Sequence, residues 1–163
     1  RSKTIFDTAG DWVGILFGIY NGISAIYALM LPRIVKRIGR KNTHAISLIA
    51  GSIGMLSMFV IKDPQLLIYS MIGIGMAWAS ILAMPYAILA GSIPDGKMGV
   101  YMGIFNFFIT IPQIVSAIVL GPIVAGLFDN HAIFALVMGG IMLLIAAISV
   151  RFVVEKQPST EAA

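Results

Sequence analysis

Three polar side chains in a long apolar stretch of the sequence are spaced so that they share one face of a helix. Asn106, Thr110 and Gln113 are four and three residues apart, and side chains at these spacings are neighbours on a helix surface. Amides both donate and accept hydrogen bonds, so such a stripe suits the hydroxyl groups of a neutral carbohydrate. The same groups can also hold membrane helices together. Gly103, one turn before Asn106, and Pro112, immediately before Gln113, favour the cavity-lining interpretation.

Aromatic and amide side chains in two other apolar stretches are further candidates. Trp78 lies well inside its stretch, unlike the aromatic residues that mark a membrane interface. Its ring could stack on the apolar face of a sugar or fill a gap between helices. Tyr20 and Asn21 need hydrogen-bond partners if they face hydrocarbon. They could contact a sugar hydroxyl or another helix.

Other chemistries lack the residues they require. The sequence has no cysteine, and its histidines, His44 and His131, are far apart, so we expect no metal site and no cofactor. No catalytic pair of carboxylates, activated nucleophile or phosphate-binding glycine loop is recognisable. No basic face interleaves with aromatic residues, so nucleic acid is not an expected partner. We therefore do not expect an enzyme.

The composition is that of a membrane protein. Hydrophobic residues make up 59% of the 163 residues and charged residues only 11%, against about 25% charged residues in soluble domains. A spanning helix needs about 20 apolar residues. Five stretches qualify, and they predict an all-α membrane bundle within residues 1–156 with a short polar tail at 157–163. The predicted spans are 12–31, 45–61, 66–93, 100–128 and 133–153.

Small residues and prolines predict how these helices pack and bend. Gly14, Gly18 and Gly22 repeat every four residues, which allows another helix to approach closely. Pro85 and Pro112 lie inside predicted spans, where each removes a backbone donor and can bend the helix. The backbone carbonyl that loses its hydrogen bond in this way must face protein or a cavity. Both helices are therefore expected to line the interior.

A basic loop predicts the orientation. Five of the eleven lysine and arginine residues lie between the first two spans with no acid among them, and short basic loops are cytoplasmic. This places the C-terminus in the cytoplasm and the visible N-terminus outside, and we expect further helices upstream. The loop is a candidate cytoplasmic gate. Its basic residues are Arg33, Lys36, Arg37, Arg40 and Lys41.

Two groups of motifs resemble a known family. The loop segment 37–41, with the sequence RIGRK, resembles the cytoplasmic signature of major facilitator superfamily transporters, with Lys36 where an aspartate is usual. The segments 78–80, 84–87, 98–106 and 111–113 resemble the tenth and eleventh helices of sucrose and maltose symporters of the glycoside–cation type. The likeness covers most of residues 10–155.

This resemblance implies that the five spans correspond to helices 8 to 12 of a twelve-helix carrier in the plasma membrane. It implies proton-coupled symport of an α-glucoside such as sucrose or maltose, by alternating access between two bundles. Asn106 and Gln113 become candidate cavity residues, followed by Trp78, Tyr20 and Asn21. The spans contain no acid away from their ends, so the proton would bind in the absent N-terminal helices.

Two alternatives remain open from the sequence. The helices could form a non-transporting scaffold or assembly subunit, with the glycine faces serving partner helices. The chain could also belong to a carrier of the same superfamily for a solute other than sugar. The absence of a membrane-embedded cation disfavours anionic substrates.

Overall fold

The computed structural model describes residues 2–94 and 96–154, with side chains from residue 9 onwards. The predicted tail at 157–163 lies outside the described residues. Within the described part the chain is helical and contains no strand. Five helices are long and apolar enough to cross a membrane, which confirms the predicted all-α membrane fold.

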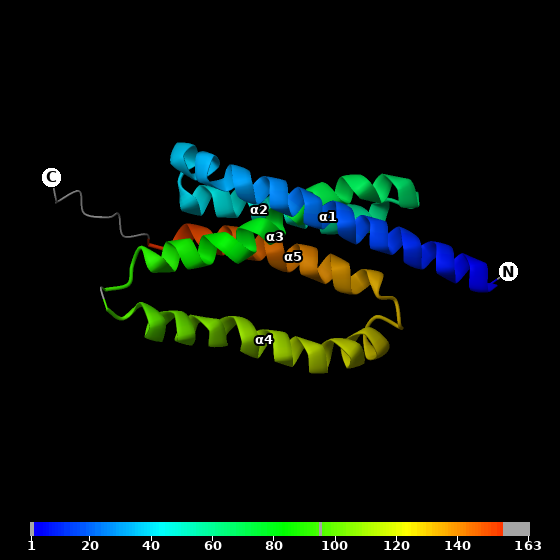
Figure 1. Ribbon diagram of the computed structural model, residues 1–163. Helices are drawn as coiled ribbons and strands as arrows, with labels where there is room; N and C mark the ends of the chain where they lie inside the picture. Colours follow the sequence, from blue (N-terminus) through cyan, green and yellow to red (C-terminus); the bar gives the residue numbers. More distant parts are fainter. Residues whose placement is uncertain (1, 95, 155–163) are drawn as a thin grey trace.

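Successive long helices run in opposite directions, so the five are arranged antiparallel along the chain (Figure 1). Short 3₁₀ turns precede α3 and follow α5, at Pro64–Leu66 and Val150–Phe152. The helices begin and end within a few residues of charged or helix-breaking positions, because lipid offers no partner to a non-helical backbone. Their bounds are α1 Ser2–Ile38, α2 Arg40–Val60, α3 Leu67–Ala90, α4 Met98–Gly126 and α5 Ile133–Ser149.

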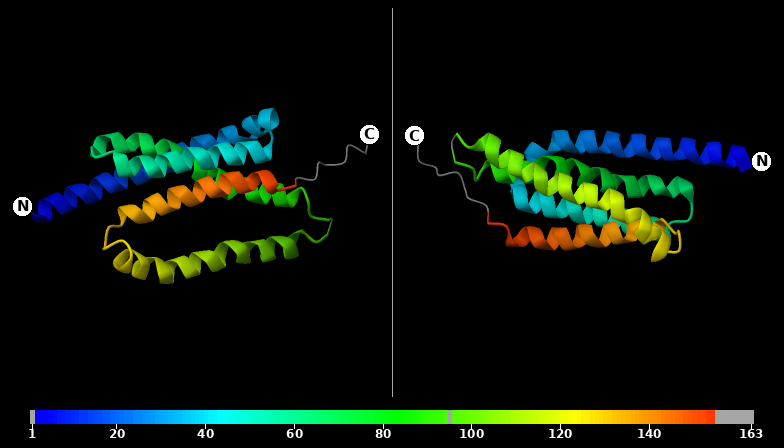
Figure 2. Two further views of the ribbon diagram at one scale, coloured as in Figure 1. Left: turned by 180° about the vertical axis from the view of Figure 1, so that it is seen from behind. Right: turned by 90° about the horizontal axis from the view of Figure 1, so that it is seen from below.

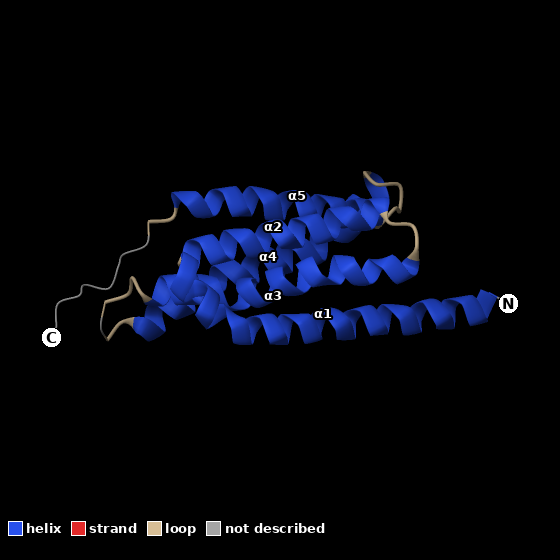
Figure 3. Cartoon of the chain, turned by 90° about the horizontal axis from the view of Figure 1, so that it is seen from above, coloured by secondary structure: helices blue, strands red, loops and turns tan. Residues whose placement is uncertain are grey.

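Helices α1, α2, α3 and α5 pack together, and α4 stands apart. Helix α2 packs against both α3 and α5, and α1 packs along α3; Figures 2 and 3 show α2 and α5 side by side. Helix α4 is set away from this group (Figure 1), and none of its residues is buried. Its interior-facing side chains are therefore open along nearly the whole helix.

The contact between α2 and α3 is built from small residues. An added Cβ at Gly54 would lie 2.6 Å from the carbonyl oxygen of Ser70, and one at Gly73 would collide with the carbonyl of Ala50. The Ser57 and Ser70 hydroxyls, 2.7 Å apart, form a hydrogen bond across the same contact. Because lipid tails are as apolar as leucine, membrane helices associate through such close packing and hydrogen bonds.

The predicted basic loop between the first two spans is helical instead. Helix α1 continues past Pro32 to Ile38, and α2 begins at Arg40, so Gly39 is the only residue between them. Gly39 has a φ of 81°, which glycine adopts without strain. Lys36 and Arg37 lie in the last turn of α1, where positive charge favours a helix because the exposed carbonyls carry partial negative charge.

Two other expectations concern glycine and proline. The stripe of Gly14, Gly18 and Gly22 has no described atom within 4 Å of where a Cβ would lie, so no described helix packs on it. Pro85 and Pro112 lie inside α3 and α4, each of which remains one continuous helix. Their role as bends stays a prediction.

Candidate solute-binding site

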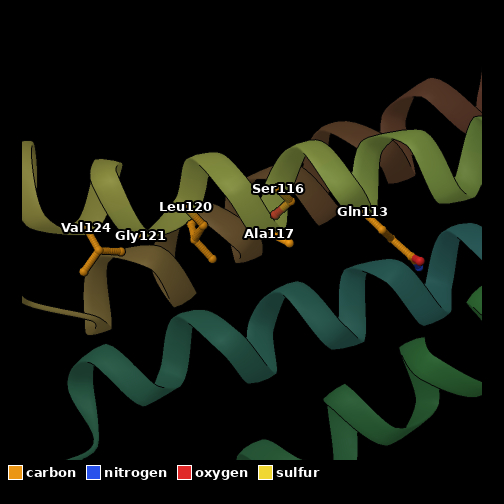
Figure 4. A pocket seen from close by; sticks show the side chains of 6 residues that line it. All are labelled: Gln113, Ser116, Ala117, Leu120, Gly121 and Val124. Atoms are coloured by element: carbon orange, nitrogen blue, oxygen red, sulfur yellow. The ribbon is translucent and has the colours of Figure 1, made fainter.

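The inner face of α4 forms an open trough. A cavity of about 620 Å³ is lined entirely by this helix, and Figure 4 shows its lining side chains on the side of α4 that faces the other helices. Gln113 and Ser116 provide polar groups at one end, and the rest of the lining is small or apolar. The lining residues are Gln113, Ser116, Ala117, Leu120, Gly121 and Val124.

Asn106 lies on the same face of α4, seven residues before Gln113. The Tyr86 hydroxyl of α3 donates a hydrogen bond of 2.7 Å to the Asn106 side-chain oxygen. The Tyr86 ring also meets Phe105 edge-on, with ring centroids 5.2 Å apart. These contacts join α3 to α4 and orient the Asn106 amide, whose NH₂ group makes no hydrogen bond to another described residue. That donor can therefore serve a solute.

Gln113 is exposed, and within the described part of the chain its amide makes no hydrogen bond. An amide carries two donors and an acceptor with two lone pairs. Because no described residue bonds to them, these groups remain available to a polar solute. Gln113 extends from α4 towards α2 in Figure 4, so its amide reaches into the space between α4 and the packed helices.

Tyr20 and Trp78 form a second aromatic group, between α1 and α3. Their ring centroids are 6.5 Å apart and their planes are inclined at 84°, a favourable edge-to-face arrangement. Trp78 is 44% exposed, so much of its indole stays open. Asn21, in contrast, donates to the carbonyl of Phe17 one turn earlier on its own helix.

The predicted site residues therefore fall into two groups joined by α3. Trp78 belongs to the group with Tyr20, and Tyr86 belongs to the group with Asn106 and Gln113. Trp78 and Tyr86 are eight residues apart, which is about 12 Å along a helix. The two groups therefore lie about two turns apart along α3.

The basic residues divide into exposed and anchored side chains. Arg33, Lys36 and Arg37 are exposed. Arg40 donates to the Ala87 carbonyl near the end of α3, at 3.1 Å. Lys41 donates to the carbonyls of Arg151, at 3.3 Å, and of Val153, beyond the end of α5. Arg40 and Lys41 thus tie together three helix ends on one side of the bundle, whereas a gating role stays a prediction.

Sequence reasoning missed two members of this arrangement. Tyr86 lies in the segment 84–87 but is not among the sequence-predicted site residues, because its contact with Asn106 depends on how α3 and α4 meet. Ser116 is also absent from the sequence-predicted site residues, although its position three residues after Gln113 continues the polar spacing on α4. No group of three or more potential metal ligands occurs among the described residues.

The comparisons with known proteins agree with a carrier architecture. No curated protein and no solved structure matches the chain. A family model described as the Major Facilitator Superfamily matches residues 3–163. The match covers nearly the entire sequence, including all five apolar helices. The chain therefore belongs to the Major Facilitator Superfamily of membrane transporters.

Proposed function

We propose that this chain is the C-terminal part of a secondary active sugar transporter that carries an α-glucoside such as sucrose or maltose together with a proton. One observation carries the proposal. The Asn106 amide, oriented by Tyr86, shares an open face of α4 with the unpaired amide of Gln113. Uncharged donors and acceptors in an otherwise apolar cavity suit a neutral polyhydroxylated solute.

The aromatic group supports the same substrate class. The exposed part of the Trp78 ring can stack on the C–H face of a pyranose, while Tyr20 supports the indole from its edge. Such stacking excludes water on one side of the sugar. The amides on α4 would then bind hydroxyl groups on the other side, so the solute would lie between α3 and α4.

The coupling proton requires an acidic or basic group that titrates within the membrane. Within the described residues, Asp63 and Asp129 lie between the long helices, and Asp11 lies inside α1, two residues after the start of its apolar span at Ala9. None of the three lies near the middle of a span. We therefore assign the proton-binding carboxylate to helices upstream of this chain. Alternating access would move those helices relative to this bundle, with the C-terminus in the cytoplasm of a plasma-membrane protein.

The test is uptake of labelled sucrose and maltose by proteoliposomes containing the full-length protein. An inward proton gradient should drive accumulation of one of these sugars. Replacing Asn106 and Gln113 together with alanine should reduce uptake at least tenfold, because two hydrogen bonds of about 1 kcal/mol each are lost. Ile118→Ala is the matched control, since Ile118 is 70% exposed on another face of α4.

Three results would count against the proposal. Failure to accumulate either sugar would point to another solute of the same superfamily. Sugar accumulation that does not depend on the proton gradient would show that transport is not coupled to protons. Unchanged uptake by the double alanine variant, at normal expression, would exclude the inner face of α4 as the binding surface.

A further inference from the structure

A groove on the outer side of the bundle runs between α2 and α5, the helices shown side by side in Figures 2 and 3. Its volume is about 460 Å³. Isoleucine and leucine side chains line its body, whereas Lys41, Asn42 and Arg151 line one end. It is separate from the trough on α4, since the two have no lining residue in common.

The body of the groove faces the surroundings with apolar side chains. Ile46 and Ile49 on α2 are 50% and 41% exposed, and Leu144 and Ile148 on α5 are 42% and 56% exposed. These residues follow helical spacing along both walls. Because both helices qualify as membrane spans, the groove lies at the depth of the acyl chains of the bilayer.

The mouth of the groove carries positive charge. Lys41 is held there by the carbonyls of Arg151 and Val153, and the Arg151 side chain is exposed. Among the residues whose side chains the structure describes, the carboxylates lie at the opposite end of the helices. They are Asp11, Asp63 and Asp129. The described part of the chain therefore offers no carboxylate to neutralise the mouth.

We propose that this groove binds an anionic phospholipid. The phosphate would lie at Lys41 and Arg151, and one acyl chain would follow the apolar walls formed by α2 and α5. Charge complementarity selects a negative headgroup, and the apolar body selects a lipid over a soluble anion. The ligand would hold α2 and α5 together, independently of which solute is carried.

The test is a lipid titration of the delipidated full-length protein, followed by native mass spectrometry. Phosphatidylglycerol should bind at least tenfold more tightly than phosphatidylcholine with the same acyl chains. Arg151→Ala should weaken phosphatidylglycerol binding about fivefold and leave phosphatidylcholine unchanged. Arg37→Ala, which removes an exposed cation at the same end but outside the groove, should change binding less than twofold.

A second pair of variants tests the apolar body without altering charge. Ile49→Trp fills the groove and should reduce phosphatidylglycerol binding at least fivefold. Ile26→Trp, at a position on α1 that is 63% exposed and outside the groove, should have no effect. Equal binding of both lipids, no loss with Arg151→Ala, or equally strong competition by soluble glycerol phosphate would each overturn the proposal.

Discussion

The imidazole of His44 on α2 lies against the hydroxyl of Ser80 on α3, with Nδ1 and Oγ 2.8 Å apart. Both side chains are buried, Ser80 completely and His44 with 8% of its surface exposed. A buried polar group without a partner costs free energy, so each residue satisfies the other. The pair fixes how α2 and α3 are aligned near the basic end of the bundle.

Ser80→Ala should therefore destabilise the protein by about 1–3 kcal/mol, because it leaves the buried His44 nitrogen without a partner. The measurement is thermal unfolding in detergent. Ser149→Ala is the control, since Ser149 is exposed and bonds only to the Ile145 carbonyl on its own helix. Equal effects of the two substitutions would show that the interhelical bond contributes nothing specific.

Gly75→Ala should also destabilise the protein, by about 1–3 kcal/mol. A Cβ at this position would lie 2.7 Å from the Tyr20 carbonyl oxygen and 3.0 Å from the Ile23 side chain, so α1 would have to move away from α3. Gly99→Ala is the control, because no described atom lies within 4 Å of its Cβ position. Thermal unfolding of both variants measures the difference, and a stable Gly75→Ala protein would contradict this close approach.

Tyr86→Phe should weaken apparent substrate affinity about fivefold and leave the amount of folded protein unchanged. The variant keeps the ring contact with Phe105 but loses the bond that orients the Asn106 amide, which is a loss of about 1 kcal/mol. Uptake kinetics give the KM. Tyr69→Phe is the control, since Tyr69 is 69% exposed, and a KM unchanged in both variants would separate Tyr86 from solute binding.

The charge distribution predicts which surface faces the cytoplasm. Lys97 lies at the basic end, together with Arg40 and Lys41, whereas Lys62 lies beside Asp63 at the other end. In intact cells, a membrane-impermeant maleimide should label Lys62→Cys, and it should label Lys97→Cys only after permeabilisation. The sequence contains no cysteine, so no other residue of this chain would be labelled by the maleimide. The reverse labelling pattern would invert the proposed orientation.

The number and type of helices could be predicted from the sequence because lipid permits little else. An apolar run of sufficient length must be helical in a membrane, and five such runs are visible. The extension of α1 past Pro32 could not be predicted in the same way. A proline followed by basic residues is typical of a loop, but near a helix C-terminus the same cations stabilise the helix.

The candidate site could be predicted only where it depends on one helix. Helical spacing places Asn106 and Gln113 on one face of α4, and the structure keeps both on that face. The partnership of Asn106 with Tyr86 depends on the approach of two helices, and no single-helix pattern encodes that approach. Nor could the separation of α4 be predicted, since an apolar side chain looks the same whether lipid or another helix covers it.

The connections between helices differ in length, and this difference has a mechanical consequence. A single residue, Gly39, separates α1 from α2, whereas residues 91–97 separate α3 from α4. Rocking of α1 must carry the first turn of α2 with it, because one residue provides no slack. The longer connection lets α4 change its tilt while α3 stays in place. The connection between α1 and α2 therefore couples the two helices rigidly, whereas the connection between α3 and α4 couples them only loosely.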